Sequence, residues 1–129
     1  MPGPWTFSMT FDDLLEHRPV LKEKYRVFLD AVNSGGHVPG RVLDLCRSRI
    51  EQIHGIAGGS SIVKSDLDEG ELAALMLAEK IPFAHHQVED DEVERVKAVY
   101  GDAGCVQLLT ALSFFDVTAR LQLTFAEVP

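Results

Sequence analysis

Cysteine is scarce in this sequence, and the scarcity excludes one class of protein. The 129 residues contain only Cys46 and Cys105, far apart and each within an apolar helical pattern. In such a pattern cysteine packs as a small hydrophobic residue. A disulfide-stapled secreted scaffold is therefore excluded, and we expect a reducing compartment, with cytoplasm as the default.

Positive charge is also in short supply. Twelve Lys and Arg stand against 20 Asp and Glu, a net charge of -8, which repels polyanions such as nucleic acid and anionic membranes. The N-terminal stretch MPGPWTFSMTFDDLLEH has neither the basic nor the apolar region of a signal peptide, and no apolar run approaches bilayer length. We expect neither a nucleic-acid partner nor a membrane partner.

Apolar residues, in contrast, are plentiful and spaced as in helices. Hydrophobic content is 46%, enough for one domain over residues 1–129. Apolar positions recur every three or four residues in residues 14–32 and 39–54, and no alternating strand pattern competes. The sequence predicts an all-α bundle of about five to six helices. The stripe of the first helix is Leu21, Tyr25, Phe28, Leu29 and Val32, and that of the second is Leu43, Cys46, Ile50 and Ile53.

Capping pairs and breakers divide the second half of the chain. Two overlapping capping patterns, Asp66 with Glu69 and Asp68 with Glu71, open a third helix that Pro82 is expected to end. A further pair, Asp91 with Glu94, is expected to cap the next helix, and Gly101 to stop it. The last segment, residues 103–126, is apolar nearly all round, which favours burial by its own domain or by another subunit. We therefore expect a homo-oligomer: a dimer, trimer or hexamer.

The stretch IEQIHGIAGG, residues 50–59, ends a helix at Gly55 and continues almost without side chains. The segments GHVPGRVLDLCRSRIEQIHG, ELAALMLAEKIPFAHHQVEDDEVERVKAVYG and LLTALSFFDVTARL together resemble the carboxymuconolactone decarboxylase superfamily, which includes the AhpD-like alkylhydroperoxidases. The resemblance implies a single helical-bundle domain of that fold, in an oligomer. It covers most of the chain from about residue 15 onward.

The resemblance also implies where redox side chains would stand. Redox-active members carry Cys-x-x-Cys directly after the glycine and a histidine four residues later. These places are Ile56, Gly59 and Val63 here, and the histidine that can lie between the cysteines falls on Gly58. The acidic residue of the family's proton relay is retained as Asp44, where glutamate is usual. The bare loop thus lies where the thiols would be.

A set of polar residues near this loop could carry other chemistry. Residues 44, 47, 51 and 54 share one face of the second helix. One interpretation is a solvated or intersubunit salt-bridge ladder; the other is a proton-transfer set in which an acid supports an imidazole and arginine holds a carboxylate substrate. Within one straight helix the acid at 44 and the imidazole at 54 are too far apart to touch. The candidates are Asp44, Glu51 and His54 as catalytic residues, and Arg47, Gly58 and Gly59 as substrate-binding residues.

Other polar motifs have simpler interpretations. His85 and His86 are adjacent in a connector, so their side chains diverge, and no metal site and no cofactor is expected. GIAGGSS lacks the Gly-Lys-Ser/Thr of a phosphate loop. Asp116 and Arg120, four residues apart in an apolar helix, form an expected structural pair that fixes packing between subunits.

Two functions remain open. The first is thiol-independent acid–base chemistry of a lyase type on a small carboxylate or lactone, as the decarboxylase branch implies. The second is a non-catalytic oligomeric binding or scaffold protein whose redox site has decayed. The sequence alone leaves open whether the protein is an enzyme.

The missing thiols give a negative prediction: we expect no hydroperoxide consumption with a dithiol donor, because Ile56 and Gly59 replace the reactive pair. The assay is repeated with Cys46→Ser and Cys105→Ser. Turnover that depends on either cysteine contradicts the prediction.

Overall fold

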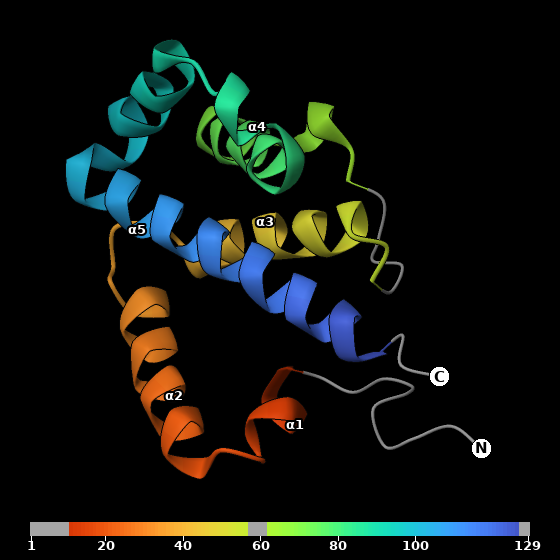
Figure 1. Cartoon of the computed structure of the whole chain (residues 1–129). Helices are drawn as coiled ribbons and strands as arrows, with labels where there is room; N and C mark the ends of the chain where they lie inside the picture. The colour runs from red at the N-terminus through yellow and green to blue at the C-terminus, as the bar shows by residue number, and fades with distance from the viewer. Residues whose placement is uncertain (1–10, 57–61, 127–129) are drawn as a thin grey trace.

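The computed structural model describes residues 11–56 and 62–126, and all regular structure in these ranges is helical (Figure 1). The all-α prediction is confirmed, and five α-helices agree with the expected five to six. The helices are α1 (Phe11–Leu15), α2 (Pro19–Asn33), α3 (Gly40–Ile53), α4 (Glu69–Ala84) and α5 (Asp90–Ala126). Two short 3-10 helices, η1 (Lys64–Asp66) and η2 (His85–Gln87), precede and follow α4.

The core lies where α3, α4 and α5 pack against one another, with α1 and α2 on the other side of α5 from α4 (Figure 1). The predicted stripe of α3 forms this core at Leu43, Cys46 and Ile50, each at most 2% exposed. Ile53, the last predicted member, is only half-buried. Leu108 and Leu112 of α5 meet the stripe, so the long apolar segment supplies the other half of the core.

The first predicted helix is in fact two. We expected one helix over residues 14–32, but α1 ends at Leu15 and α2 begins at Pro19. Arg18 has φ -138° and ψ 80°, outside the helical region, because the ring of the following proline disfavours helical geometry there. Proline at the first position of α2 costs no hydrogen bond.

The start of α4 confirms one of the two overlapping capping patterns. The Asp68 carboxylate accepts from the Glu71 amide at 2.8 Å, and the Glu71 carboxylate accepts from the Asp68 amide at 3.0 Å. Asp66 lies in η1 instead, so its predicted pairing with Glu69 is wrong. Only one of two overlapping boxes can form, because only one residue can be the N-cap of a helix.

The predicted end of the third helix is wrong. Pro82 lies inside α4, which continues to Ala84. A proline in the last turn removes one hydrogen bond near the frayed end, where the loss matters least.

The start of α5 also differs from the prediction. The helix begins at Asp90, and the Glu92 carboxylate accepts from the Glu89 amide at 3.0 Å. The predicted cap formed by Asp91 and Glu94 is therefore replaced by one that lies two residues earlier. Lys80 Nζ of α4 lies 2.6 Å from Glu92 Oε1, and this ion pair stabilises Glu92 in the capping position. The local sequence does not reveal a contact between two helices.

Gly101 divides α5, as the sequence predicted, although the chain resumes as helix directly after it. Its φ of 75° and ψ of 177° are accessible to glycine and strained for other residues. Figure 1 shows the ribbon changing direction at this point. The kink lets the part after Gly101 cross the core while the part before it lies beside α4.

We expect Gly101→Ala to lower the free energy of unfolding by about 1–3 kcal/mol, the cost of placing a side chain at this backbone geometry. A Cβ at residue 101 would meet no atom within 4 Å, so backbone strain alone is tested. The measurement is urea denaturation.

Gly40→Ala is the matched control. It also has open space around its Cβ, but it lies at the start of α3 without a positive φ. Equal stability changes in the two variants contradict the assignment of strain to Gly101.

Candidate functional site

The C-terminal end of α3 positions His54. The helix ends at Ile53, and the His54 amide still donates to the Ile50 carbonyl at 3.1 Å. Gly55 follows with φ 77°, a left-handed geometry that ends helices and favours glycine. The predicted helix end is confirmed, and it fixes the direction in which the imidazole leaves α3.

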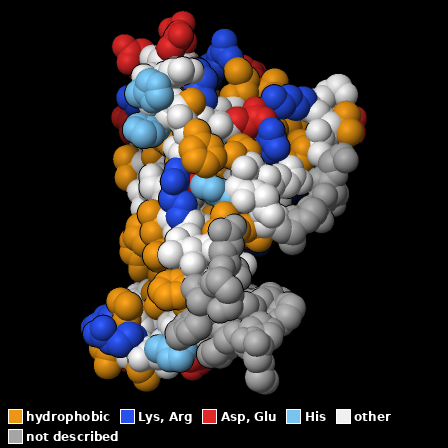
Figure 2. All heavy atoms as spheres, turned by 45° about the vertical axis from the view of Figure 1, so that its right-hand side comes forward, with side chains coloured by type: hydrophobic (Ala, Val, Ile, Leu, Met, Phe, Trp, Pro, Cys, Tyr) orange, Lys and Arg blue, Asp and Glu red, His pale blue; other side chains and the backbone are white. Residues whose placement is uncertain are grey.

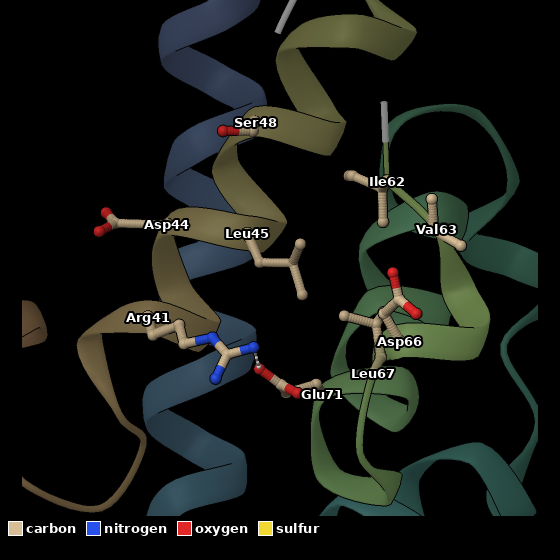
Figure 3. A pocket seen from close by; sticks show the side chains of 9 residues that line it. All are labelled: Arg41, Asp44, Leu45, Ser48, Ile62, Val63, Asp66, Leu67 and Glu71. Atoms are coloured by element: carbon tan, nitrogen blue, oxygen red, sulfur yellow. Dashed lines mark ion pairs between the residues drawn. The ribbon is translucent and has the colours of Figure 1, made fainter. Parts of the chain in front are cut away.

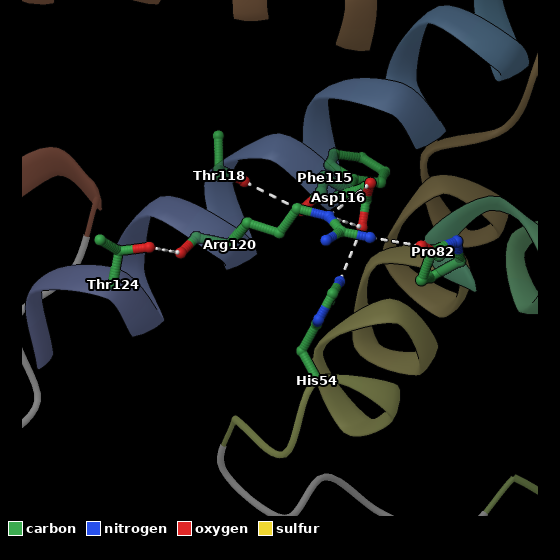
Figure 4. Close-up of polar contacts among 7 residues, drawn as sticks. All are labelled: His54, Pro82, Phe115, Asp116, Thr118, Arg120 and Thr124. Atoms are coloured by element: carbon green, nitrogen blue, oxygen red, sulfur yellow. Dashed lines mark hydrogen bonds and ion pairs between the residues drawn. The ribbon is translucent and has the colours of Figure 1, made fainter. Parts of the chain in front are cut away.

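The imidazole contacts a carboxylate on α5. His54 Nε2 lies 2.6 Å from Asp116 Oδ1, and the His54 side chain is 4% exposed (Figure 4). The same carboxylate accepts from Arg120 Nε, at 3.2 Å to Oδ1 and 3.1 Å to Oδ2. The four-residue spacing predicted the Asp116–Arg120 pair, with a role in subunit packing. The structure adds His54 within the same chain.

The last turn of α4 completes the group. Arg120 Nη2 donates to the Pro82 carbonyl, and the guanidinium lies 5.0 Å from the ring centre of Phe83. His54 meets the same ring edge-on, with ring centres 5.2 Å apart. Phe83 is 63% exposed. We call His54, Phe83, Asp116 and Arg120 the His54 cluster.

The contacts of the His54 cluster define which imidazole nitrogen carries the proton. A carboxylate held by arginine can only accept hydrogen bonds, so Nε2 carries the proton and donates to Asp116. In the neutral imidazole, Nδ1 is then an acceptor. No described residue forms a hydrogen bond with Nδ1. The arrangement can therefore take up a proton at Nδ1 while Asp116 stabilises the resulting imidazolium.

The other predicted site residues do not join this cluster. Asp44 and Arg47 pair with each other at 3.1 Å, and their side chains are 72% and 51% exposed. Glu51 is half-buried in the last turn of α3, and no described ion pair includes it. Gly58 and Gly59 lie outside the described residues. His54 is thus the one predicted catalytic residue that the structure places in a buried polar contact.

Both thiols are poor nucleophiles in this fold. Cys46 is fully buried, and burial raises the pKa of its thiol to about 12. Burial also raises the pKa of Cys105, which lies at the core side of α5. The reactive form is the thiolate, so the raised pKa values keep both thiols in the less reactive protonated form at neutral pH.

A second polar region surrounds a pocket between α3 and the segment leading into α4 (Figure 3). Its volume is about 390 Å³. Asp44 lies on its rim, whereas His54 does not line it. Arg41 of α3 forms an ion pair with Glu71 of α4 across it, at 2.9 Å. The sequence pattern does not reveal this pair, because Arg41 and Glu71 lie on different helices.

Metal ligands are not grouped in the part of the chain that the structure describes. No set of three or more His, Cys, Asp or Glu side chains there has a metal-binding arrangement. The ring centres of His85 and His86 lie 5.7 Å apart, and the rings are nearly perpendicular.

Figure 2 shows histidine, arginine or lysine, and hydrophobic side chains next to one another on one face of the molecule.

Comparisons of the chain with protein-family models, with curated proteins and with solved structures find no match.

Proposed function

We propose that this protein performs thiol-independent acid–base chemistry on a small carboxylate or lactone, with His54 as the proton-transfer group. The observation that supports this most is the 2.6 Å contact between His54 Nε2 and Asp116. A carboxylate on one imidazole nitrogen fixes the tautomer and leaves the other nitrogen basic, as general-base histidines require.

The residues of the His54 cluster have separable roles in this proposal. With a lactone, Nδ1 of His54 takes a proton from the attacking water and gives it to the ring oxygen as the acyl C–O bond breaks, and the carboxylic acid formed then ionises. With a β-keto acid, loss of CO2 breaks the C–C bond and leaves an enolate, which the protonated Nδ1 of His54 protonates. Asp116 holds the ring and balances the positive charge that develops on it. Arg120 uses Nε and Nη2 within the protein, so Nη1 can receive the substrate carboxylate. Arg120 therefore replaces Arg47 as the proposed carboxylate-binding residue.

We also propose that the chain is a diverged member of the carboxymuconolactone decarboxylase superfamily, on the resemblance of its helices. The helix that carries Asp44 ends two residues before the expected glycine, Gly55, which has the left-handed geometry of a helix end. The segment LLTALSFFDVTARL contributes Asp116 to the His54 cluster.

We expect His54→Gln to lower kcat/KM at least 100-fold on whichever small lactone or β-keto acid the wild type converts, because general acid–base catalysis typically contributes that much. Substrates are screened by proton release for lactones and by CO2 release for keto acids. Circular dichroism checks that the variant folds.

His85→Gln serves as the control, since His85 is exposed in η2 and outside the His54 cluster. Full activity of folded His54→Gln overturns the proposal. A wild type that converts none of the lactones and keto acids also counts against it.

A second candidate is a non-catalytic, oligomeric scaffold, favoured by apolar side chains on the outside of the molecule. On α5, Val106 is 66% and Val117 is 48% exposed, and on α2, Val20 and Val27 are 70% and 65% exposed. Scattered exposed apolar residues are normal, but a row of them on one helix is typical of an interface. Self-association would bury this row.

The length and apolar composition of α5 bear on where the protein is located. Within the described residues, 90–125 form one helix that is long and apolar enough to cross a membrane by length and composition alone. Core helices pass the same test, and here 33% of the most apolar window is buried in the protein. Asp116 and Arg120 pair within this helix. A cytoplasmic location remains our proposal.

We expect light scattering at micromolar concentration to give a multiple of the chain mass, and Val106→Lys with Val117→Lys to reduce it to the monomer. A lysine at each position places a charge in the contact at high desolvation cost. Val63→Lys, at an exposed position before α4, is the control and should leave the mass unchanged. A monomeric wild type contradicts self-association.

A further inference from the structure

The pocket between α3 and the start of α4 combines apolar walls with charged groups. We call it the α3–α4 pocket. Its volume of about 390 Å³ is in the range of sites for small organic ligands. Leu45 of α3 and Leu67 of the chain before α4 are half-buried in its walls. The remaining lining residues are Arg41, Asp44, Ser48, Ile62, Val63, Asp66 and Glu71.

Two of the three carboxylates are neutralised within the protein. Glu71 is 4% exposed and is held by Arg41 at 2.9 Å and by the Asp68 amide at 3.0 Å. Asp44 is held by Arg47 at 3.1 Å. These charges cancel in pairs, so neither carboxylate leaves a strong demand for an external cation.

Asp66 is the third carboxylate, and its charge is not balanced in this way. No described residue forms an ion pair or hydrogen bond with its side chain. It lies in η1, and Figure 3 shows its carboxylate beside Val63, across the pocket from Leu45. One negative charge therefore faces a cavity with leucine side chains on two walls.

We propose that the α3–α4 pocket binds a small organic cation, namely a primary ammonium that carries a short alkyl chain. The ammonium group donates hydrogen bonds to Asp66, and the alkyl chain packs against Leu45 and Leu67. The ion pair contributes little by itself at an exposed site, so the apolar contact must supply a large part of the affinity.

The chemistry of the walls distinguishes this ligand from others. A divalent metal ion needs several unengaged oxygen ligands, and Asp44 and Glu71 are already paired. A carboxylate ligand would be repelled by the negative charge of Asp66. The site is separate from the His54 cluster, and the proposal does not depend on the proposed catalysis.

The test is titration of the full chain with n-butylammonium, followed by calorimetry and by amide shifts in NMR. We expect saturable binding with shifts at Leu45, Val63 and Leu67. Asp66→Asn should weaken the affinity at least tenfold, and Leu45→Ser should weaken it through loss of the apolar wall. His54→Gln should leave it unchanged, which separates this site from the proposed catalytic one.

Asp102→Asn, at another exposed aspartate outside the pocket, is the matched control and should bind as the wild type does. Equal binding of butyrate, competition by Ca²⁺ at the same concentration, or no saturation in the millimolar range would each overturn the proposal. Unchanged affinity in folded Asp66→Asn would do the same.

Discussion

The carboxylate of Asp116 links the three helices whose apolar faces form the core. It binds His54 at the end of α3 and Arg120 one turn further along α5, and Arg120 in turn binds the Pro82 carbonyl of α4. One side chain on α5 thus fixes the ends of two other helices. The side chains of His54 and Asp116 are 4% and 15% exposed. Loss of the Asp116 carboxylate would leave the nearly buried N–H of His54 unpaired and lower the free energy of unfolding by roughly 1–3 kcal/mol.

The same contacts can serve stability and chemistry at once. A histidine that is oriented by a carboxylate and shielded from most water is held rigidly, which a structural role requires. It also has a defined tautomer with one basic nitrogen, which proton transfer requires. The mutant assays distinguish these roles because catalysis needs Nδ1 of the imidazole, whereas helix docking needs only a donor at Nε2. Glutamine retains a donor and lacks the second, basic nitrogen.

Charge is distributed so that the two candidate ligand sites differ in sign. At the His54 cluster Nη1 of Arg120 forms no hydrogen bond with a described residue and Asp116 is fully engaged, which suits the proposed anionic ligand. At the α3–α4 pocket the arginine is engaged by Glu71 and Asp66 is open, so a cationic ligand fits. The sequence predicts one site along a face of α3, and neither candidate site has that arrangement. The imidazole leaves the end of that helix toward α5, and Asp44 stays at the surface.

Local sequence determined the helices, because apolar spacing, proline, glycine and capping pairs act over a few residues. The stripe of α3, its end at Gly55, the Asp68–Glu71 box and the break at Gly101 were all predictable for this reason. Tertiary structure decided the rest. His54 and Asp116 are 62 positions apart, and only the packing of α3 on α5 brings them together. The ion pair between Lys80 and Glu92 favours a start of α5 earlier than the local sequence predicts. Helix α4 includes Pro82 because the loss of one hydrogen bond in its last turn is small compared with the contacts across the core.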